Sequence, residues 1–195
     1  SINDGNGHGT HVAGTIGAKN DGNGVVGVAA GATIVGVKVL ADNGSGSTSD
    51  IVKGCNYVAN TGAPGDVANL SLGGGASTSL DNAVKGIAAK GIYTCVAAGN
   101  SARKASNYSP ARANAPNLYT ISAFGQTTNP SRPDPFASFS NYGDRNTNSP
   151  IDYSEPGVSV LSTYKNGQYA TLSGTSMAAP HAAGILLVRG GTFGT

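Results

Sequence analysis

The residues best suited to chemistry lie near the end of the chain, in residues 174–181, which read GTSMAAPH. A glycine, two hydroxyl residues and a run of small apolar residues predict a sharp turn that leads into a helix. Ser176 would then lie at the helix N-terminus, where free backbone N–H groups and the helix dipole favour a developing negative charge. Pro180 agrees with this interpretation, because a proline early in a helix removes an N–H that has no helical partner. The plainer alternative is that Thr175 or Ser176 only caps the helix.

Two histidines form a second cluster, because His8 and His11 lie three residues apart in the stretch NGHGTHVAG. On a helix they would share one face, and metal ligands also use this spacing. A zinc hydrolase would need a third ligand, and the one remaining histidine is His181. The alternative for His11 and His181 is a core imidazole that bonds to the backbone.

Two predicted strands end in turns that carry polar groups or glycines. In AAGN, residues 97–100, the side-chain amide of Asn100 would lie at a strand tip and could donate to an oxyanion. The alternative is an ordinary Gly-Asn turn. In NLSLGGG, residues 69–75, the glycines would let a second backbone approach closely.

The length and composition of the chain limit the classes of protein to which it can belong. The 195 residues suffice for one domain, and the 30 glycines lack a collagen-like period, so they indicate turns and close packing. Only 11% of residues are charged and the net charge is +2, so we expect neither a nucleic-acid nor a membrane partner. Few charges and many small residues suit an extracellular protein.

Hydrophobic patterns predict strands and helices in alternation. We expect strands at 33–40, 67–72, 92–98, 117–124, 136–139 and within 151–164, and helices at 7–18, 48–59 and 79–90 besides the helix of Ser176. A hairpin loop is expected at Asn166 and Gly167. The alternation favours an α/β fold with a doubly wound, mostly parallel sheet and helices on both faces. In such sheets, sites gather beyond the C-terminal ends of the strands.

The only cysteines are Cys55 and Cys95, predicted in a helix and in a buried strand. Two separate thiols in the core and a single bridge are both compatible with the sequence.

Together these stretches resemble the subtilisin-like serine proteases, or subtilases, and most closely the proteinase K branch. The matching motifs occur in the family's order over nearly the whole chain. They are GHGTHVAGT at 7–15, NLSLGGG at 69–75, AAGN at 97–100, FSNYG at 139–143 and SGTSMAAPH at 173–181. The resemblance implies that residues 1–195 form one incomplete catalytic domain with the subtilisin-like fold.

The same resemblance implies a serine endopeptidase. Ser176 would be the nucleophile and His8 the general base, while the Asn100 amide and the Ser176 N–H would bind the oxyanion. The substrate would add as a strand between two exposed edges, with an apolar or aromatic residue in an uncharged S1 pocket. The implied substrate-binding residues are Ser45, Gly46, Ser47, Ser71, Leu72, Gly73, Ala97, Ala98 and Gly99.

One part of the family's site is missing from the sequence. The catalytic Asp of subtilases lies in an Asp-(Ser/Thr)-Gly motif well upstream of the histidine, and Asp4 is too close to His8 and lies in the wrong motif. We therefore expect a catalytic domain that is truncated at both ends. The alternative is an inactive fragment or a peptide-binding pseudoprotease.

The resemblance also bears on ligands, partners and location. It implies no cofactor for the chemistry, but it suggests a structural calcium ion held by the Asp21 carboxylate and the carbonyls of Lys19, Asn23 and Val25. The alternative at this loop is a plain polar turn. The expected protein is a secreted monomer that meets protein and peptide substrates and a prodomain or protein inhibitor.

Overall fold

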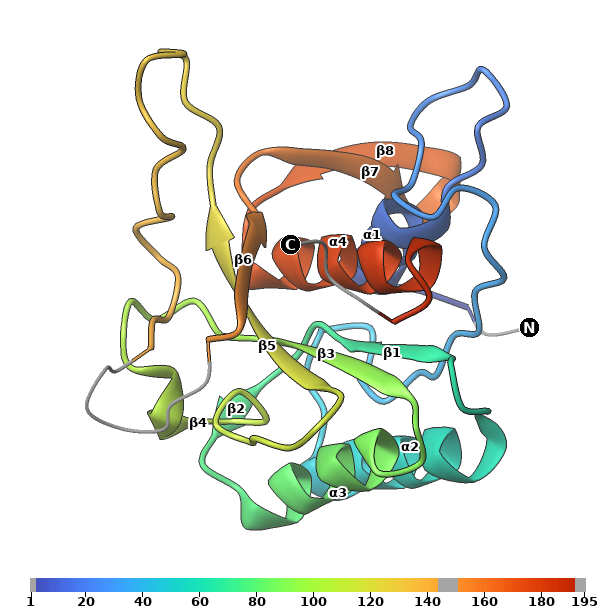
Figure 1. The fold of residues 1–195 in the computed structure, drawn as a ribbon. Helices are drawn as coiled ribbons and strands as arrows, with labels where there is room; N and C mark the ends of the chain where they lie inside the picture. Colours follow the sequence, from blue (N-terminus) through green and yellow to red (C-terminus); the bar gives the residue numbers. More distant parts are fainter. Residues whose placement is uncertain (1–2, 144–150, 192–195) are drawn as a thin grey trace.

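A central parallel sheet organises the computed structural model, which describes residues 3–143 and 151–191 (Figure 1). Its strand order is β1–β3–β5–β6, and each neighbouring pair is parallel. The strands are β1 (Val67–Leu70), β3 (Tyr93–Ala97), β5 (Leu118–Phe124) and β6 (Tyr153–Pro156). The expected α/β fold with a mostly parallel sheet is confirmed.

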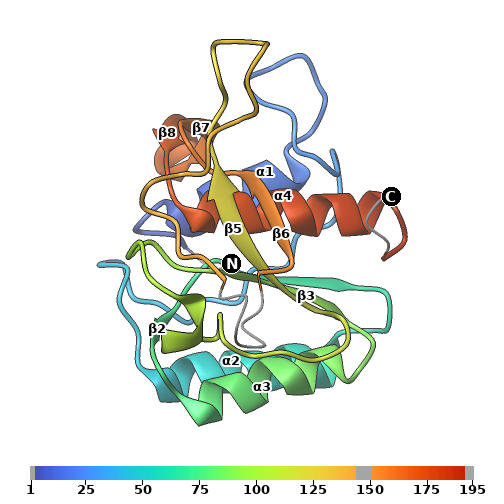
Figure 2. The same ribbon diagram turned by 60° about the vertical axis from the view of Figure 1, so that its left-hand side comes forward.

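Helices cover both faces of this sheet. One face carries α4 (Thr175–Val188), with α1 (His8–Gly17) packed beside it, and the other carries α2 (Thr48–Thr61) and α3 (Thr78–Ala88) (Figures 1 and 2). The alternation of side chains along β3 divides the core between the two faces. Cys95 and Ala97 belong to the cluster beneath α4, whereas Val96 belongs to the cluster of α2 and α3.

Smaller elements complete the described fold. β7 (Val160–Tyr164) and β8 (Gln168–Leu172) form an antiparallel hairpin through the 3-10 turn η2 (Lys165–Gly167), where Asn166 adopts a left-handed φ of 60°. The hairpin expected there is confirmed. β2 (Gly74–Gly75) pairs with β4 (Tyr108–Ser109), and η1 (Ala105–Asn107) precedes β4.

The predicted buried strand at 33–40 is wrong. The structure assigns no strand to these residues, and Val35 is 74% exposed. A run of β-branched residues favours a strand but does not supply the neighbour that its hydrogen bonds need. Among the described residues the edge strand β1 pairs with β3 and with no other strand, and a cavity lined by residues 36–41 and 69–73 lies beside it.

The short strand expected at 136–139 is also wrong. Phe136 makes one antiparallel bridge with Phe124, and Ser140 N–H then donates to the Ala137 carbonyl, so the chain turns before a strand can extend. The other predicted helices and strands are found within a few residues of their expected bounds.

The two cysteines are separate thiols. Cys55 on α2 and Cys95 on β3 are both free and buried, and they lie in different hydrophobic clusters. Burial raises the pKa of Cys55 to about 11, so its thiol stays protonated at neutral pH. Of the two alternatives that the sequence left open, the structure has the pair of unbridged thiols.

In the part of the chain that the structure describes, no helix combines the length and the apolar character that crossing a membrane requires.

Candidate active site

Ser176 is the second residue of α4, at the end that faces the strand tips. The helix begins at Thr175, after the N-cap residue Gly174, and no side chain of the cap residue bonds to the helix. Thr175 is fully buried and Ser176 is half-buried. The alternative in which either hydroxyl only caps the helix is therefore wrong, and the Ser176 backbone N–H remains available at the helix start.

The side chain of Asn100 is oriented by Thr175. The Asn100 Oδ1 atom accepts hydrogen bonds from the Thr175 backbone N–H at 2.8 Å and from the Thr175 hydroxyl at 2.9 Å. The same hydroxyl accepts the Gly99 N–H at 3.0 Å. Because its oxygen is occupied in this way, the Asn100 amide presents its NH₂ group as a free donor.

Two N–H donors border the space above Gly174. A Cβ atom placed on this glycine would lie 3.4 Å from Asn100 Nδ2 and 3.7 Å from the backbone nitrogen of Ser176. Gly174 also has a φ of 157°, at the edge of the region that L side chains avoid. The glycine therefore keeps open a pocket in which an oxygen atom can meet both donors.

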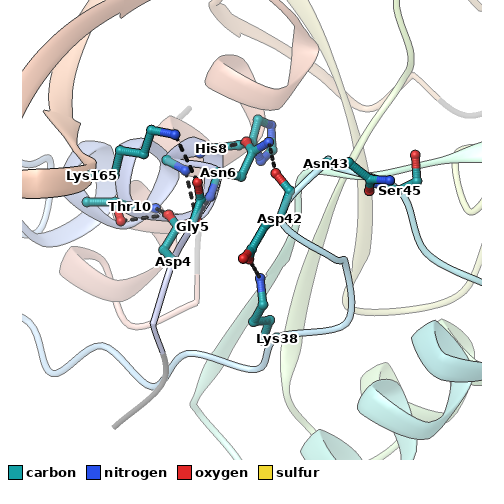
Figure 3. A network of polar contacts seen from close by, with 11 residues as sticks. Asp4, Gly5, Asn6, His8, Thr10, Lys38, Asp42, Asn43, Ser45 and Lys165 are labelled. Atoms are coloured by element: carbon teal, nitrogen blue, oxygen red, sulfur yellow. Dashed lines mark hydrogen bonds and ion pairs between the residues drawn. The ribbon is translucent and has the colours of Figure 1, made fainter.

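His8 is the first residue of α1, and the preceding Gly7 fixes the entry of the chain. Gly7 has a φ of 104°, and a Cβ atom there would clash with the ring of Tyr164. The Asn6 side chain accepts the His8 backbone N–H at 3.2 Å and donates to the Asp42 carbonyl at 3.0 Å (Figure 3). Asn6 thus ties the loop that precedes Ser45 to the helix that carries the histidine.

Asp4 caps α1 and does not approach the imidazole as a triad acid would. Its carboxylate accepts the backbone N–H groups of Asn6, Gly7 and Thr10 and the Thr10 hydroxyl, at 2.7 to 3.1 Å (Figure 3). Burial would raise the pKa of Asp4, but these hydrogen bonds outweigh it and lower the pKa to about 2. In the described residues, no hydrogen bond joins this carboxylate to the His8 ring.

The His8 ring is suited to accept a proton at neutral pH. Burial is the main cause that lowers its pKa, the nearby His11 lowers it further, and the charge of Asp4 opposes both. A lowered pKa keeps the imidazole neutral, which is the form that a general base needs.

Two adjoining cavities separate His8 from the oxyanion donors. A cavity of about 880 Å³ is lined by His8, Ser45, Gly46 and residues 69–73, and one of about 390 Å³ is lined by Asn100, Ser176 and residues 97–99. They share Leu72 and Gly73. The Ser176 hydroxyl donates to the Ser71 carbonyl at 3.4 Å, and no hydrogen bond between it and His8 is formed in the described structure.

Eight of the nine predicted substrate-binding residues line these cavities, and Ser47 is the exception. The side chain of Ser47 caps α2, because its hydroxyl accepts the Asp50 N–H at 3.1 Å. The structure brings the others to the cavity walls.

The remaining histidines are bonded to the backbone. His11 Nε2 lies 3.0 Å from the carbonyls of Val160 and Ala170, and His181 Nδ1 lies 2.7 Å from the Met177 carbonyl in its own helix. Since these carbonyls occupy Nε2, a zinc centre built on His8 and His11 would have to use His11 Nδ1, which is buried without a hydrogen-bond partner in the described structure, and it would still need a third ligand. Over residues 3–143 and 151–191, no group of three or more His, Cys, Asp and Glu side chains has a metal-binding arrangement.

The loop with the predicted calcium ligands is exposed and closed by its own hydrogen bonds. Asp21 Oδ1 accepts the Asn23 N–H at 3.0 Å, and Asn23 Nδ2 donates to the Asp21 carbonyl at 3.4 Å. Calcium takes six to eight oxygen ligands, whereas Asp21 is the one carboxylate among the four predicted ligands. The four residues do not by themselves complete a calcium site.

Sequence reasoning missed the side chains that hold the site in place. Thr175 orients Asn100, Asn6 ties Asp42 to α1, and the Ser71 hydroxyl donates to the Ser176 carbonyl at 2.7 Å. All three residues lie inside or directly beside the motifs already identified, so motif proximity is the signal that could have found them.

Comparisons with known proteins identify the family of the chain. The family model described as "Subtilase family" matches residues 1–189, so the chain belongs to the subtilase family.

Among curated relatives, the chain is similar to the subtilisin-like serine protease AsES of Sarocladium strictum, at 48% identity over 98% of this chain and 46% of that protein. It is also similar to Proteinase R of Parengyodontium album, at 45% identity over 95% of this chain and 44% of that protein. A solved cold-adapted subtilisin-like serine proteinase superposes with a TM-score of 0.82 at 44% identity, over 96% of this chain and 62% of that one. The predicted family is confirmed, and the chain spans less than half the length of these two curated relatives.

The Asp4 cap gives a prediction about stability. Because the folded-state pKa of Asp4 is below its ordinary value of 3.8, its contribution is present above that pH and is lost as the pH falls through about 2. We expect Asp4→Ala to lower the free energy of unfolding by about 1 kcal/mol at pH 7 and by much less at pH 2, where half of the folded carboxylates are protonated. Urea unfolding at both pH values measures this. Asp134→Ala, which removes a carboxylate that accepts a single backbone N–H on an exposed loop, is the control, and an Asp4→Ala deficit as large at pH 2 as at pH 7 would contradict the cap.

Proposed function

We propose that the protein is a serine endopeptidase in which Ser176 attacks the scissile carbonyl while His8 removes the hydroxyl proton. The carbonyl oxygen becomes an oxyanion and accepts the N–H groups of Asn100 and Ser176. His8 then returns the proton to the leaving amine, and water hydrolyses the acyl-enzyme by the same route. The observation that carries the proposal is the pair of N–H donors around Gly174, next to a serine at a helix N-terminus.

We propose that the triad carboxylate comes from a strand outside the described residues, seated in the larger cavity. Four observations support this seat. The cavity is bordered by residues 36–41 and by β1, whose second edge has no strand partner among the described residues. The apolar Ile34 and Val35 beside it are exposed. The Asn69 Oδ1 atom is buried without a partner in the described structure, and Asn69 and His8 both line the cavity.

Labelling with a phosphonyl fluoride tests the nucleophile and the acid together. In the full-length protein we expect Ser176 to be modified, and Ser176→Ala to abolish labelling. Residues 1–195 alone should react far more slowly, since loss of the triad Asp in subtilisin, itself a subtilase, lowers kcat by about 3 × 10⁴. Without that carboxylate, the rate of the short form should fall only as the pH drops below 6.5, because the His8 pKa is lowered and the base is neutral above it.

The pH dependence distinguishes the alternatives. A carboxylate beside His8 raises its pKa, so the acid limb of the full-length protein should lie at higher pH than that of the short form. An unreactive Ser176 in the full-length protein would support the pseudoprotease instead. Identical acid limbs would contradict the strand seat.

We propose broad cleavage after apolar and aromatic residues. The smaller cavity is lined by Leu72 and by residues 97–99, and no charged residue is among its described lining residues. Turnover of peptides that differ only at P1 should favour Phe, Tyr and Leu over Lys and Arg by about tenfold or more, because nothing in the pocket offsets the desolvation of a cation. A preference for Lys or Arg would defeat the proposal.

Calcium binding is proposed only with further oxygen ligands from outside the four residues of the loop. The Asn20–Val25 turn chemistry and the Asp21 carboxylate support it. We expect calcium to raise the Tm of the full-length protein and Asp21→Asn to remove most of that rise, since calcium prefers charged oxygens. An equal rise in both proteins would place the ion elsewhere.

The protein is further proposed to be a secreted monomer that acts on proteins and peptides and meets a prodomain or protein inhibitor. Its low charge and its similarity to the Alkaline serine exoprotease A of Vibrio alginolyticus, at 46% identity, support this. Gel filtration and detection in culture medium would test it.

A further inference from the structure

Pro180 leaves the carbonyl of Ser176 without its helical donor. In an α-helix each carbonyl accepts the N–H of the residue four positions later, and the residue four positions after Ser176 is Pro180, inside α4. A proline has no backbone N–H, so this carbonyl cannot be satisfied by the helix. The site beside the nucleophile therefore contains one acceptor that another element must satisfy.

Ser71 supplies the missing donor from the end of β1. Its hydroxyl donates to the Ser176 carbonyl at 2.7 Å, a short hydrogen bond. The single proton of this hydroxyl is directed by Asn69, whose Nδ2 atom donates to Ser71 Oγ at 3.0 Å. Because Oγ accepts from Asn69, its own proton is left to point at Ser176.

A second contact links the same two residues in the opposite direction. The Ser176 hydroxyl donates to the Ser71 carbonyl at 3.4 Å, which is long for such a bond. The short contact therefore holds the Ser176 backbone, whereas the long one leaves its side chain free to turn.

We propose that Ser71, whose hydroxyl is oriented by Asn69, is a positioning residue for the nucleophile Ser176. By holding the carbonyl of Ser176 at the end of β1, it fixes the ψ angle of that residue and anchors its backbone, and with it the Cα–Cβ bond from which Oγ projects, relative to the sheet. This inference rests on the proposed role of Ser176. It assigns to the Ser71 side chain a task separate from that of its backbone, which lies at the predicted substrate edge.

A double-mutant cycle in the full-length protein tests the proposal. Ser71→Ala removes the donor, and Pro180→Ala restores a backbone N–H that can satisfy the Ser176 carbonyl within the helix. We expect Ser71→Ala to lower kcat and the rate of phosphonyl fluoride labelling by about tenfold, with KM and the acid limb of the pH profile unchanged. In the Pro180→Ala background the same substitution should cost less than about threefold.

Further variants separate positioning from folding. Ser71→Thr keeps a hydroxyl and should retain most of the rate, and Asn69→Ala should reproduce part of the Ser71→Ala loss. Ser131→Ala, on an exposed loop, is the matched control, and a Tm measured for every variant gives the folded fraction at the assay temperature.

Each outcome decides the matter. Equal penalties for Ser71→Ala in the two backgrounds, or a Ser71→Ala protein with the parental labelling rate, would overturn the positioning role while leaving the proposed function intact. Absence of any labelling at Ser176 in the parental protein would overturn both.

Discussion

The site depends on the close packing of α4 against the sheet. Ala178, Ala179, Ala182 and Ala183 are buried at this contact, and side chains this small let the helix backbone approach the strands closely. The approach brings the start of the helix level with the end of β3. Only at that distance can Thr175 reach Asn100, with bonds of 2.8 and 2.9 Å.

The two neighbouring residues at the start of α4 have different roles. Thr175 is turned into the protein, where it fixes the Asn100 amide and the Gly99 backbone, whereas Ser176 faces the cavity. A net hydrogen bond contributes only about 1 kcal/mol to stability. The larger effect of the Thr175–Asn100 hydrogen bonds is geometric, because they orient the Asn100 amide so that its NH₂ group faces the cavity.

Much of the architecture could be predicted from the sequence, because helix and strand periods and glycine-marked strand ends are local signals. The helix of Ser176, the tip that carries Asn100 and the helix that begins at His8 all follow from such signals. The cavities form between segments that are distant in the sequence, so local signals do not predict them. Only the order of the family motifs indicated that these segments come together.

The failures have a common physical origin in contacts that the sequence does not display. The run at 33–40 has the composition of a strand but lacks a partner in the described structure, so Val35 lies in solvent. The sequence does not show the hydrogen-bond partners of Asp4 and Ser71, because these depend on the folded geometry. Asp4 caps a helix, and Ser71 donates to a carbonyl that lacks its helical donor because of a proline. The sequence also could not decide between bridged and separate cysteines.

The separate thiols have a practical consequence. Cys55 and Cys95 are packed as small apolar side chains in different parts of the core, and no covalent link restrains the described chain. This part of the fold is therefore held by non-covalent contacts, and no disulfide makes its stability depend on the redox state of its surroundings. Reducing agents should neither loosen it nor interfere with its refolding, and an oxidising environment is not needed for it to form.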